Sequence, residues 1–210
     1  MPKNVLGVGA HYDDLELGCG GTLIKHVENG DNVTMIVLTD SAYQDPSQKV
    51  IRTAEEAGRE GKEAAKIIGA ELICLNYKVF MVPFDDFLGS IIQGYIEDLK
   101  IDVVYSHWVN DLHRDHQNAA RTTLMAGRHI PKFLMYRSNF YDTEQLFRGN
   151  VYSDISDVIE LKSDAMMAYK SELERVNYRW LDFFLNQHEN DGQKIGVRYA
   201  ECFEIVRYLI

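Results

Sequence analysis

Short apolar runs alternate with longer segments of helical character through the first two thirds of the chain. The runs contain many β-branched residues, which is typical of buried strands; they are NVLGVGA, NVTMIVLTD, AELICLN, IDVVYSHW and KFLMYRS. The clearest helical segments are TAEEAGREGKEAAKIIGA, FDDFLGSIIQGYIEDLK and DHQNAARTTLMAGRHI. Strands joined by crossovers of this length form a mainly parallel sheet with helices on both faces. The pattern therefore predicts an α/β fold of the doubly wound, Rossmann-like type.

The last third of the chain departs from this alternation. It contains a strand-like VYSDI, a long helical stretch from about Val158 to Asn186, and a closing strand-like segment, YAECFEIVRYLI. We expect a C-terminal strand-helix-strand extension that caps the sheet. No repeat or linker interrupts the chain, and 210 residues suit one core, so we predict a single domain over residues 1–210.

The charge, the cysteines and the apolar runs indicate which partners and which cellular compartment to expect. A formal net charge of −10 without any cluster of Lys and Arg argues against binding to nucleic acid. The three cysteines, Cys19, Cys74 and Cys202, lie far apart, which favours reduced thiols over disulfides or Cys-based metal sites. No apolar run has the length of a signal peptide core or of the ~18 residues of a membrane span. We therefore expect a cytoplasmic protein with no membrane span.

Polar residues gather directly after the predicted strands. His11 to Glu16 follow the first strand, Asp40 and Ser41 the second, and His107 to His116 the fourth. In open α/β sheets, ligands bind at the carboxyl ends of the strands, so these segments should meet at one crevice. The candidate residues are His11, Asp13, Asp14, Glu16, His107, Asp111, His113, Asp115 and His116.

A dinucleotide site is one alternative for the first turn. Gly7 and Gly9 open the turn, and Asp40 ends the second strand about where an acidic ribose-binding residue would stand. However, Tyr12 occupies the position of the third glycine, and Asp13 and the next aspartate would repel a pyrophosphate. These details argue against a dinucleotide.

A solvated acidic loop is a second alternative, in which Asp13 or Asp14 caps the helix that follows. The second polar cluster weakens it, because so many carboxylates cannot all ionise in one crevice without a cation. The spacings in HYDD and HRDH can supply two histidines and one carboxylate to a divalent ion. His107 can be a further ligand or a hydrogen-bonded structural histidine.

The two polar segments resemble the motifs of a known family. AHYDDLELGCGGT is similar to the AHPDDxE motif of the LmbE-like, or PIG-L, family of zinc-dependent sugar N-deacetylases, and HRDHQNA resembles its HPDHxxA motif. SDISDVIELK and RYAECFE are similar to the closing segments of that family. The resemblance implies one zinc ion per chain, with other divalent ions as alternatives, and an N-acetyl amino sugar as substrate. We also expect a homo-oligomer.

The resemblance also implies a role for each motif residue. The metal ligands become His11, Asp14 and His116; the general base is Asp13; and the auxiliary histidine, oriented by a carboxylate, is His113 with Asp115. Asp13 would take a proton from the metal-bound water, and an imidazolium at His113 would stabilise the oxyanion. Either residue could then protonate the leaving amine. Glu16 is expected to hold His11 or its loop.

Two arginines are candidate substrate ligands. Arg52, in the sequence Arg52-Thr-Ala-Glu55, fits the family's R-x-x-E pattern, although counting back from the end of that helix leads to the vicinity of Arg59 instead. Arg114 stands where the family usually has proline, as does Tyr12. Arg114 would either pair with a neighbouring aspartate and stiffen the turn, or hold an anionic group of a substrate such as a nucleotide sugar.

Two other functions fit the same residues. A site of two histidines and one carboxylate also suits non-haem Fe(II) enzymes. A metal-dependent sugar-binding protein without catalysis would not need Asp13 beside a metal ligand. The adjacency of Asp13 and Asp14 therefore favours the hydrolase.

Overall fold

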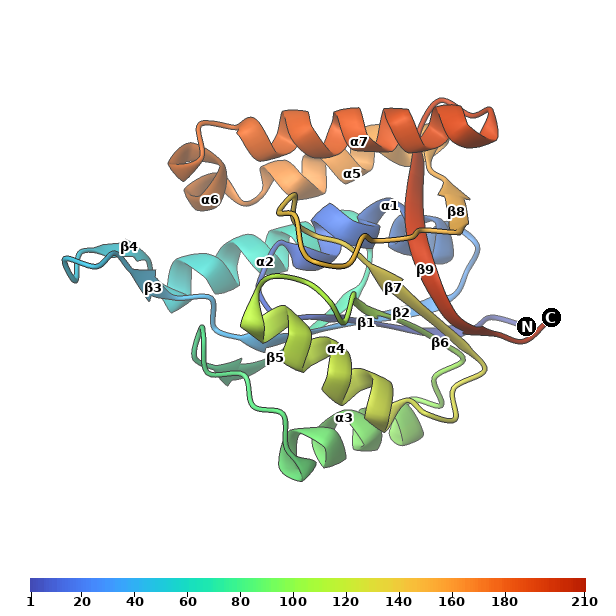
Figure 1. The fold of residues 1–210 in the computed structure, drawn as a ribbon, viewed down its shortest axis with the longest axis horizontal. Helices are drawn as coiled ribbons and strands as arrows, with labels where there is room; N and C mark the ends of the chain where they lie inside the picture. Colours follow the sequence, from blue (N-terminus) through green and yellow to red (C-terminus); the bar gives the residue numbers. More distant parts are fainter.

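The computed structural model describes residues 1–210 and confirms the predicted alternation of strands and helices (Figure 1). The strands are β1 (Asn4–Gly9), β2 (Asn32–Thr39), β3 (Tyr43–Gln44), β4 (Val50–Arg52), β5 (Glu71–Tyr77), β6 (Val103–His107), β7 (Lys132–Tyr136), β8 (Val151–Asp154) and β9 (Ala200–Tyr208). The helices are α1 (Asp14–Glu28), α2 (Ala54–Ile68), α3 (Asp86–Asp98), α4 (Arg114–Ala126), α5 (Ile159–Met167), α6 (Lys170–Arg175) and α7 (Arg179–Ile195), and a 3-10 turn covers Ser156–Val158.

Helix ends follow local chemistry. The Thr53 hydroxyl accepts the N–H of Glu56 at 3.1 Å and begins α2, and Asp85 accepts the N–H of Leu88 at 2.9 Å and begins α3. Helix α2 ends at Gly69, whose φ of 83° suits a residue without a side chain.

Seven strands form one mixed sheet in the order β5-β2-β1-β6-β7-β9-β8. Strands β5, β2, β1, β6 and β7 run parallel, whereas β9 is antiparallel to both of its neighbours, β7 and β8. The expectation that the C-terminal strands cap the sheet is therefore wrong. They extend it, because the edge of β7 offers unpaired backbone groups that β9 satisfies.

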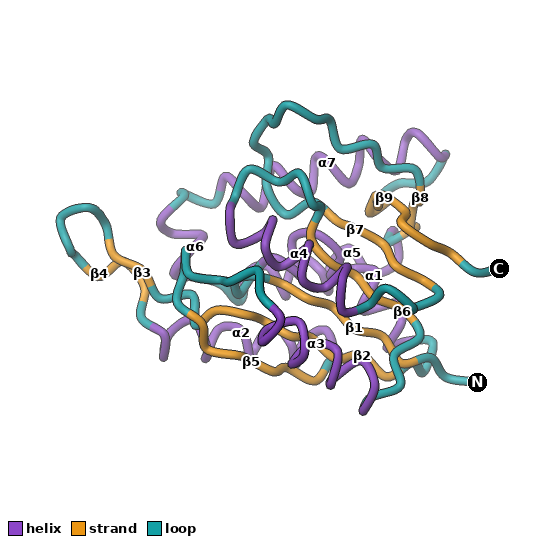
Figure 2. The backbone as a smooth tube through the Cα atoms, turned by 60° about the horizontal axis from the view of Figure 1, so that its bottom comes forward, coloured by secondary structure: helices purple, strands orange, loops and turns teal.

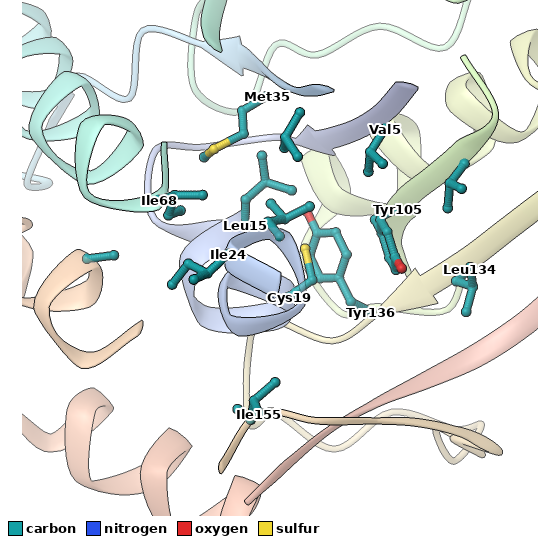
Figure 3. Close-up of a cluster of buried hydrophobic side chains, with 14 of the residues drawn as sticks. Val5, Leu15, Cys19, Ile24, Met35, Ile68, Tyr105, Leu134, Tyr136 and Ile155 are labelled. Carbon is teal, nitrogen blue, oxygen red and sulfur yellow. The ribbon is translucent and has the colours of Figure 1, made fainter. Parts of the chain in front are cut away.

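Helices cover both faces of this sheet. Helices α1, α2 and α5 lie on one face with α7 outside α5, and α3 and α4 lie on the other (Figures 1 and 2). The layer beneath α1 contains Leu15 and Cys19 of the helix and Tyr136 of β7 (Figure 3). Gly18 permits this close approach, since a Cβ there would lie 2.1 Å from Cδ2 of Tyr136.

The predicted long helix from Val158 to Asn186 is wrong, because the chain breaks it into α5, α6 and α7. Asn177 and Tyr178 adopt left-handed φ values of 50° and 59° between the last two of these helices. Val176, Asn177 and Tyr178 are weak helix formers and Asn tolerates the left-handed region, so the break coincides with a local weakness in helix propensity. It turns α6 toward the carboxyl edge of the sheet.

A short hairpin of β3 and β4 was not predicted. Its strands have two and three residues, which is too short for an alternating pattern to be recognised. The pairing sets Tyr43 opposite Arg52. The hairpin projects from the body of the molecule at the left of Figure 1.

The strand order reverses at β1 and β6, which are neighbours in the sheet but far apart in sequence. The two motif segments leave the carboxyl ends of these two strands, where open α/β sheets bind ligands. None of the helices has the length and apolarity that crossing a membrane requires.

Candidate active site

Three of the predicted metal ligands come together at this point. His11 Nδ1 lies 3.2 Å from His116 Nε2 and 3.5 Å from Asp14 Oδ2. His116 Nε2 lies 3.3 Å from Asp14 Oδ1. Bonds of about 2.0–2.1 Å to a tetrahedral zinc ion would place its ligand atoms about 3.3 Å apart. The donor types suit zinc, and ligand atoms within 4.8 Å of one another form two overlapping sets, one of His11, His113 and His116 and the other of Asp14, His107 and His116.

His107 lies within the same cluster but has a different environment. It is fully buried, and its Nε2 accepts the backbone N–H of Ala10 at 3.0 Å. Its ring stacks on His116 with centroids 4.0 Å apart. The same Nε2 also lies 3.1 Å from Asp14 Oδ2, and His107 forms a possible metal-holding group with Asp14 and His116, so its position suits both a further ligand and a support for the ring of His116.

Asp13 is the residue that precedes α1, and it does not cap the helix. Its φ of 102° is left-handed, and its side chain makes no capping hydrogen bond. The side chain instead lines the cavity beside the three ligands. Burial and the adjacent charge of Asp14 raise the pKa of Asp13 well above its usual value. The solvated-loop alternative thus disagrees with the structure.

Asp14 is held by groups from three segments. One oxygen, Oδ1, accepts from Ser138 Oγ at 2.8 Å, and the other accepts the backbone N–H of His11 at 2.7 Å. Burial opposes ionisation, but the imidazoles of His116 and His107 outweigh it and lower the pKa of Asp14 well below its usual value. Asp14 is therefore an ionised carboxylate, as a metal ligand must be.

His113 lies beside the ligands, but the carboxylate of Asp115 does not orient it as expected. The backbone N–H of Asp115 donates to His113 Nδ1 at 3.2 Å. The carboxylate of Asp115 instead lies 3.1 Å from His11 Nε2. Because Nδ1 of His113 is an acceptor, this contact assigns its proton to Nε2. Burial and the nearby charges of His116 and His11 lower the pKa of His113 to about 4, so the ring is neutral at pH 7.

Glu16 lies one turn into α1 and is almost completely buried. Its Oε1 accepts from the hydroxyl of Tyr169 at 2.8 Å, so it contacts the segment between α5 and α6 rather than the His11 ring. Burial raises the pKa of Glu16 to about 7. The expectation that Glu16 holds His11 is corrected accordingly, since its partner comes from a distant part of the chain.

Arg52 lines the cavity, as predicted, and belongs to a buried network of charges. Its guanidinium lies 3.0 Å from Glu60 Oε2 and 3.7 Å from Glu172 Oε1. Glu172 also accepts from the Tyr43 hydroxyl at 2.9 Å and from Arg175 at 2.6 Å. Arg59, the alternative candidate, is exposed and does not line the cavity.

Arg114 does not make the ion pair with a neighbouring aspartate that was one of its two expected roles. Its guanidinium donates to the backbone carbonyl of Phe80, and no ion pair joins it to Asp111 or Asp115. It does not line the cavity, so its position gives no support to a contact with an anionic substrate. The partner, Phe80, lies 34 residues earlier in the chain, which is why the motif alone could not reveal it.

The cavity has a volume of about 260 Å³ and combines the polar cluster with aromatic walls. Sequence reasoning missed several of its residues, since they come from the hairpin, from the segment after β7 and from α6 and α7. Ser138 is the last residue of the predicted strand KFLMYRS, and this place at the carboxyl end of a strand is the one signal that could have identified it. Other missed residues in the lining include Tyr43, Phe80, Asn139, Phe140, Tyr141, Glu172 and Arg175.

Comparison with known proteins agrees with this geometry. Residues 6–126, more than half of the chain, match the family PIG-L, described as GlcNAc-PI de-N-acetylase. The chain belongs to the PIG-L family. The PIG-L match includes both motif turns, and therefore all three candidate metal ligands, but it ends before the helices that supply Glu172 and Arg175.

Individual PIG-L relatives are similar along most of the chain. An uncharacterized deacetylase, YaiS, from Escherichia coli K12 is 29% identical over 80% of this chain and 91% of its own length. Diacetylchitobiose deacetylase from Thermococcus kodakarensis is 27% identical over 97% of this chain and 83% of its own. The solved N,N'-diacetylchitobiose deacetylase from Pyrococcus horikoshii superposes with a TM-score of 0.82 at 24% identity, covering 97% and 84% of the two chains.

Proposed function

We propose that this protein is a zinc-dependent hydrolase that removes the acetyl group from the amide nitrogen of an N-acetyl amino sugar. The observation that carries the proposal is the spacing of His11, Asp14 and His116 for one ion, with Asp13 and His113 beside them in one cavity. The names of the PIG-L relatives support the same reaction class. The products would be acetate and a free amino sugar.

Zinc in such a site lowers the pKa of a water molecule to about 7 and polarises a carbonyl group. Asp13 supplies the proton transfers. Its carboxylate accepts a proton as water attacks the acetyl carbon, and it returns this proton to the amine nitrogen as the C–N bond breaks. Burial and the charge of Asp14 raise the pKa of Asp13, which makes its carboxylate a better proton acceptor.

His113 stabilises the oxyanion as a neutral donor. Its Nε2 carries the proton because Nδ1 accepts from the N–H of Asp115. The Nε2–H group donates to the carbonyl oxygen as negative charge develops on it, which is the role of an oxyanion-hole donor. A neutral His113 is a weaker acid than an imidazolium, which leaves Asp13 as the proton donor to the amine.

The wall formed by Arg52 and Glu172 would bind the sugar. Both residues line the cavity, and both are almost completely buried, so their charged groups are held in fixed positions in its wall. Glu172 keeps Tyr43 and Arg175 in place beside it. Hydroxyl groups of a sugar can accept and donate hydrogen bonds to such a set, and aromatic rings such as Trp180 can cover its apolar face.

The Asp13→Asn variant and a substrate panel test the proposal. Zinc-loaded protein is mixed with N-acetylglucosamine, diacetylchitobiose and a nucleotide-linked N-acetyl sugar, and acetate release is measured. Asp13→Asn should keep its zinc but lose at least about a hundredfold in kcat, the usual size of a general-base contribution. The matched control is Asp86→Asn, an exposed aspartate in the first turn of α3.

The outcomes separate the alternatives. A non-catalytic sugar-binding protein would bind a sugar but release no acetate from any substrate. An iron enzyme would be active with Fe(II) and oxygen but not with zinc alone. Full activity of Asp13→Asn would show that Asp13 is not the general base.

A further inference from the structure

The loop between β5 and α3 reaches across the cavity to His113. The Phe80 ring stacks on the imidazole of His113 with centroids 5.2 Å apart and an angle of 20° between the planes. Phe80 has a φ of 65°, a left-handed conformation that is costly for a bulky side chain and persists only where the surroundings hold it. The cause of this conformation must lie in the contacts of its backbone.

Two consecutive residues of α4 hold Phe80 from both sides of its backbone. Its N–H donates to Asp115 Oδ2 at 2.6 Å, and its carbonyl accepts from the guanidinium of Arg114. The N–H of Val82 donates to the other oxygen of Asp115 at 3.3 Å. Both groups that hold Phe80 are charged, and hydrogen bonds to charged groups are stronger than neutral ones.

The ring of His113 is consequently enclosed. His11 lies at its edge with centroids 4.7 Å apart, His116 also lies 4.7 Å away, and Phe80 stacks against it at 5.2 Å. Of these neighbours, His11 and Phe80 come from loops, and Phe80 is the exposed one, at 56%. Because the Phe80 side chain is largely exposed, the hydrogen bonds to its backbone are what keep its ring over the imidazole.

We propose that Arg114 and Phe80 are positioning residues for His113, with Arg114 holding the Phe80 backbone so that its ring keeps the Nε2–H of His113 aimed into the cavity. The proposal rests on the proposed function, because it assigns the pair to the donor for the oxyanion. It also accounts for an arginine where the similar motif has proline. Neither residue takes part in a proton transfer.

Hydrogen exchange tests the hold on Phe80 without any activity. Arg114→Pro keeps a residue favoured at the first position of a helix, and Arg114→Met keeps the length of the side chain, but both remove the donor. We expect the hydrogen-bonded amides of Phe80, Met81 and Val82 to exchange at least about tenfold faster in both variants, which corresponds to one charge-assisted hydrogen bond. Arg121→Met, an exposed arginine of the same helix, should leave them unchanged. Unchanged exchange in both Arg114 variants would overturn the proposal.

Kinetics then test the positioning. Phe80→Ala should lower kcat by roughly tenfold with a smaller rise in KM, since the donor is misplaced in the transition state. Phe80→Tyr keeps the ring and should restore kcat. As a single substitution, Arg114→Met should lower kcat. In the Phe80→Ala background it should cause no further loss, because Arg114 acts through the Phe80 ring. Zinc content should be equal in all variants.

Additive losses in the double variant would overturn the proposal, because Arg114 would then act independently of Phe80. A failure of the proposed function is distinct from this result. It would appear as the absence of acetate release by the unmodified protein, and the exchange experiment would still test the hold on Phe80.

Discussion

Lys162 Nζ lies 2.5 Å from Glu201 Oε1, and both side chains are fully buried. This ion pair joins α5 to β9. The same carboxylate accepts the backbone N–H groups of Gly21 at 2.8 Å and Thr22 at 2.7 Å, so it also holds α1. The C-terminal extension is thereby tied to the helix that begins with the candidate metal ligand Asp14.

Removing one partner of this pair should destabilise the protein. Lys162→Met leaves the Glu201 carboxylate buried without its cation, and we expect the free energy of unfolding to fall by about 3–5 kcal/mol. Unfolding in urea measures it. Lys170→Met, at an exposed lysine, is the control. If the free energies of unfolding of Lys162→Met and Lys170→Met differ by less than about 1 kcal/mol, the expectation is contradicted. Lys162→Met with Glu201→Leu should recover part of the loss, since no unpaired charge remains.

Metal binding should depend on His116. We expect the purified protein to bind about one zinc ion per chain, and His116→Ala to lose most of its affinity, because two side-chain ligands rarely hold zinc. Elemental analysis and competition with a chelator measure this. His129→Ala, at an exposed histidine, should bind zinc like the unmodified protein. Full zinc affinity in His116→Ala would refute the ligand assignment.

Glu172 should affect the sugar and not the metal. Glu172→Gln weakens the hold on Tyr43 and Arg175, so KM for an N-acetyl sugar should rise roughly tenfold, the effect of one lost charge-assisted contact. Zinc content should stay the same. Steady-state kinetics measure the change, with Glu174→Gln, an exposed residue of the same helix, as the control. If the two substitutions change KM equally, Glu172 does not contribute to sugar binding.

His188 should make stability depend on pH. Burial lowers the pKa of His188 well below its ordinary value of 6.5, so the folded protein keeps the ring neutral while the unfolded chain binds a proton below pH 6.5. The contribution to stability is therefore complete above that pH and is lost as the pH falls. Between pH 7 and pH 5 this loss amounts to as much as about 2 kcal/mol.

Urea unfolding at the two pH values measures this dependence. Between pH 7 and pH 5, the free energy of unfolding of His188→Leu should fall by about 2 kcal/mol less than that of the unmodified protein, because the imidazole that binds a proton in the unfolded chain is absent. His129→Leu, at an exposed histidine, should retain the full decrease. Identical decreases in the unmodified protein and in His188→Leu would show that His188 does not contribute.

Local patterns predicted the first two thirds of the fold. Alternation of apolar runs and helical segments identified β1, β2, β5, β6 and β7, because each of these elements is long enough to show its period. The same reasoning placed the two motif turns at neighbouring strand ends. Their convergence needs only the rule that parallel strands share one carboxyl edge. His11, Asp14 and His116 could therefore be grouped before any coordinates.

Tertiary structure alone decided the partners of these residues. Asp115 contacts His11 and the Phe80 loop instead of orienting His113, and Glu16 contacts Tyr169. Hydrogen bonds between segments that are far apart in sequence leave no period in the chain, so spacing cannot reveal them.

The C-terminal third shows the same division between local and tertiary information. The sequence from Val158 to Asn186 is mostly composed of good helix formers, from which one helix is predicted, although Val176, Asn177 and Tyr178 are weak ones. The left-handed backbone at Asn177 and Tyr178 breaks it, and Glu172 then reaches the cavity wall to bind Arg175 and Tyr43. The sequence by itself indicated the parallel strands and the polar residues at their carboxyl ends, because these signals lie within single segments, and the family resemblance implied which of those residues bind a metal. The walls of the cavity depend on contacts that exist only in the folded chain.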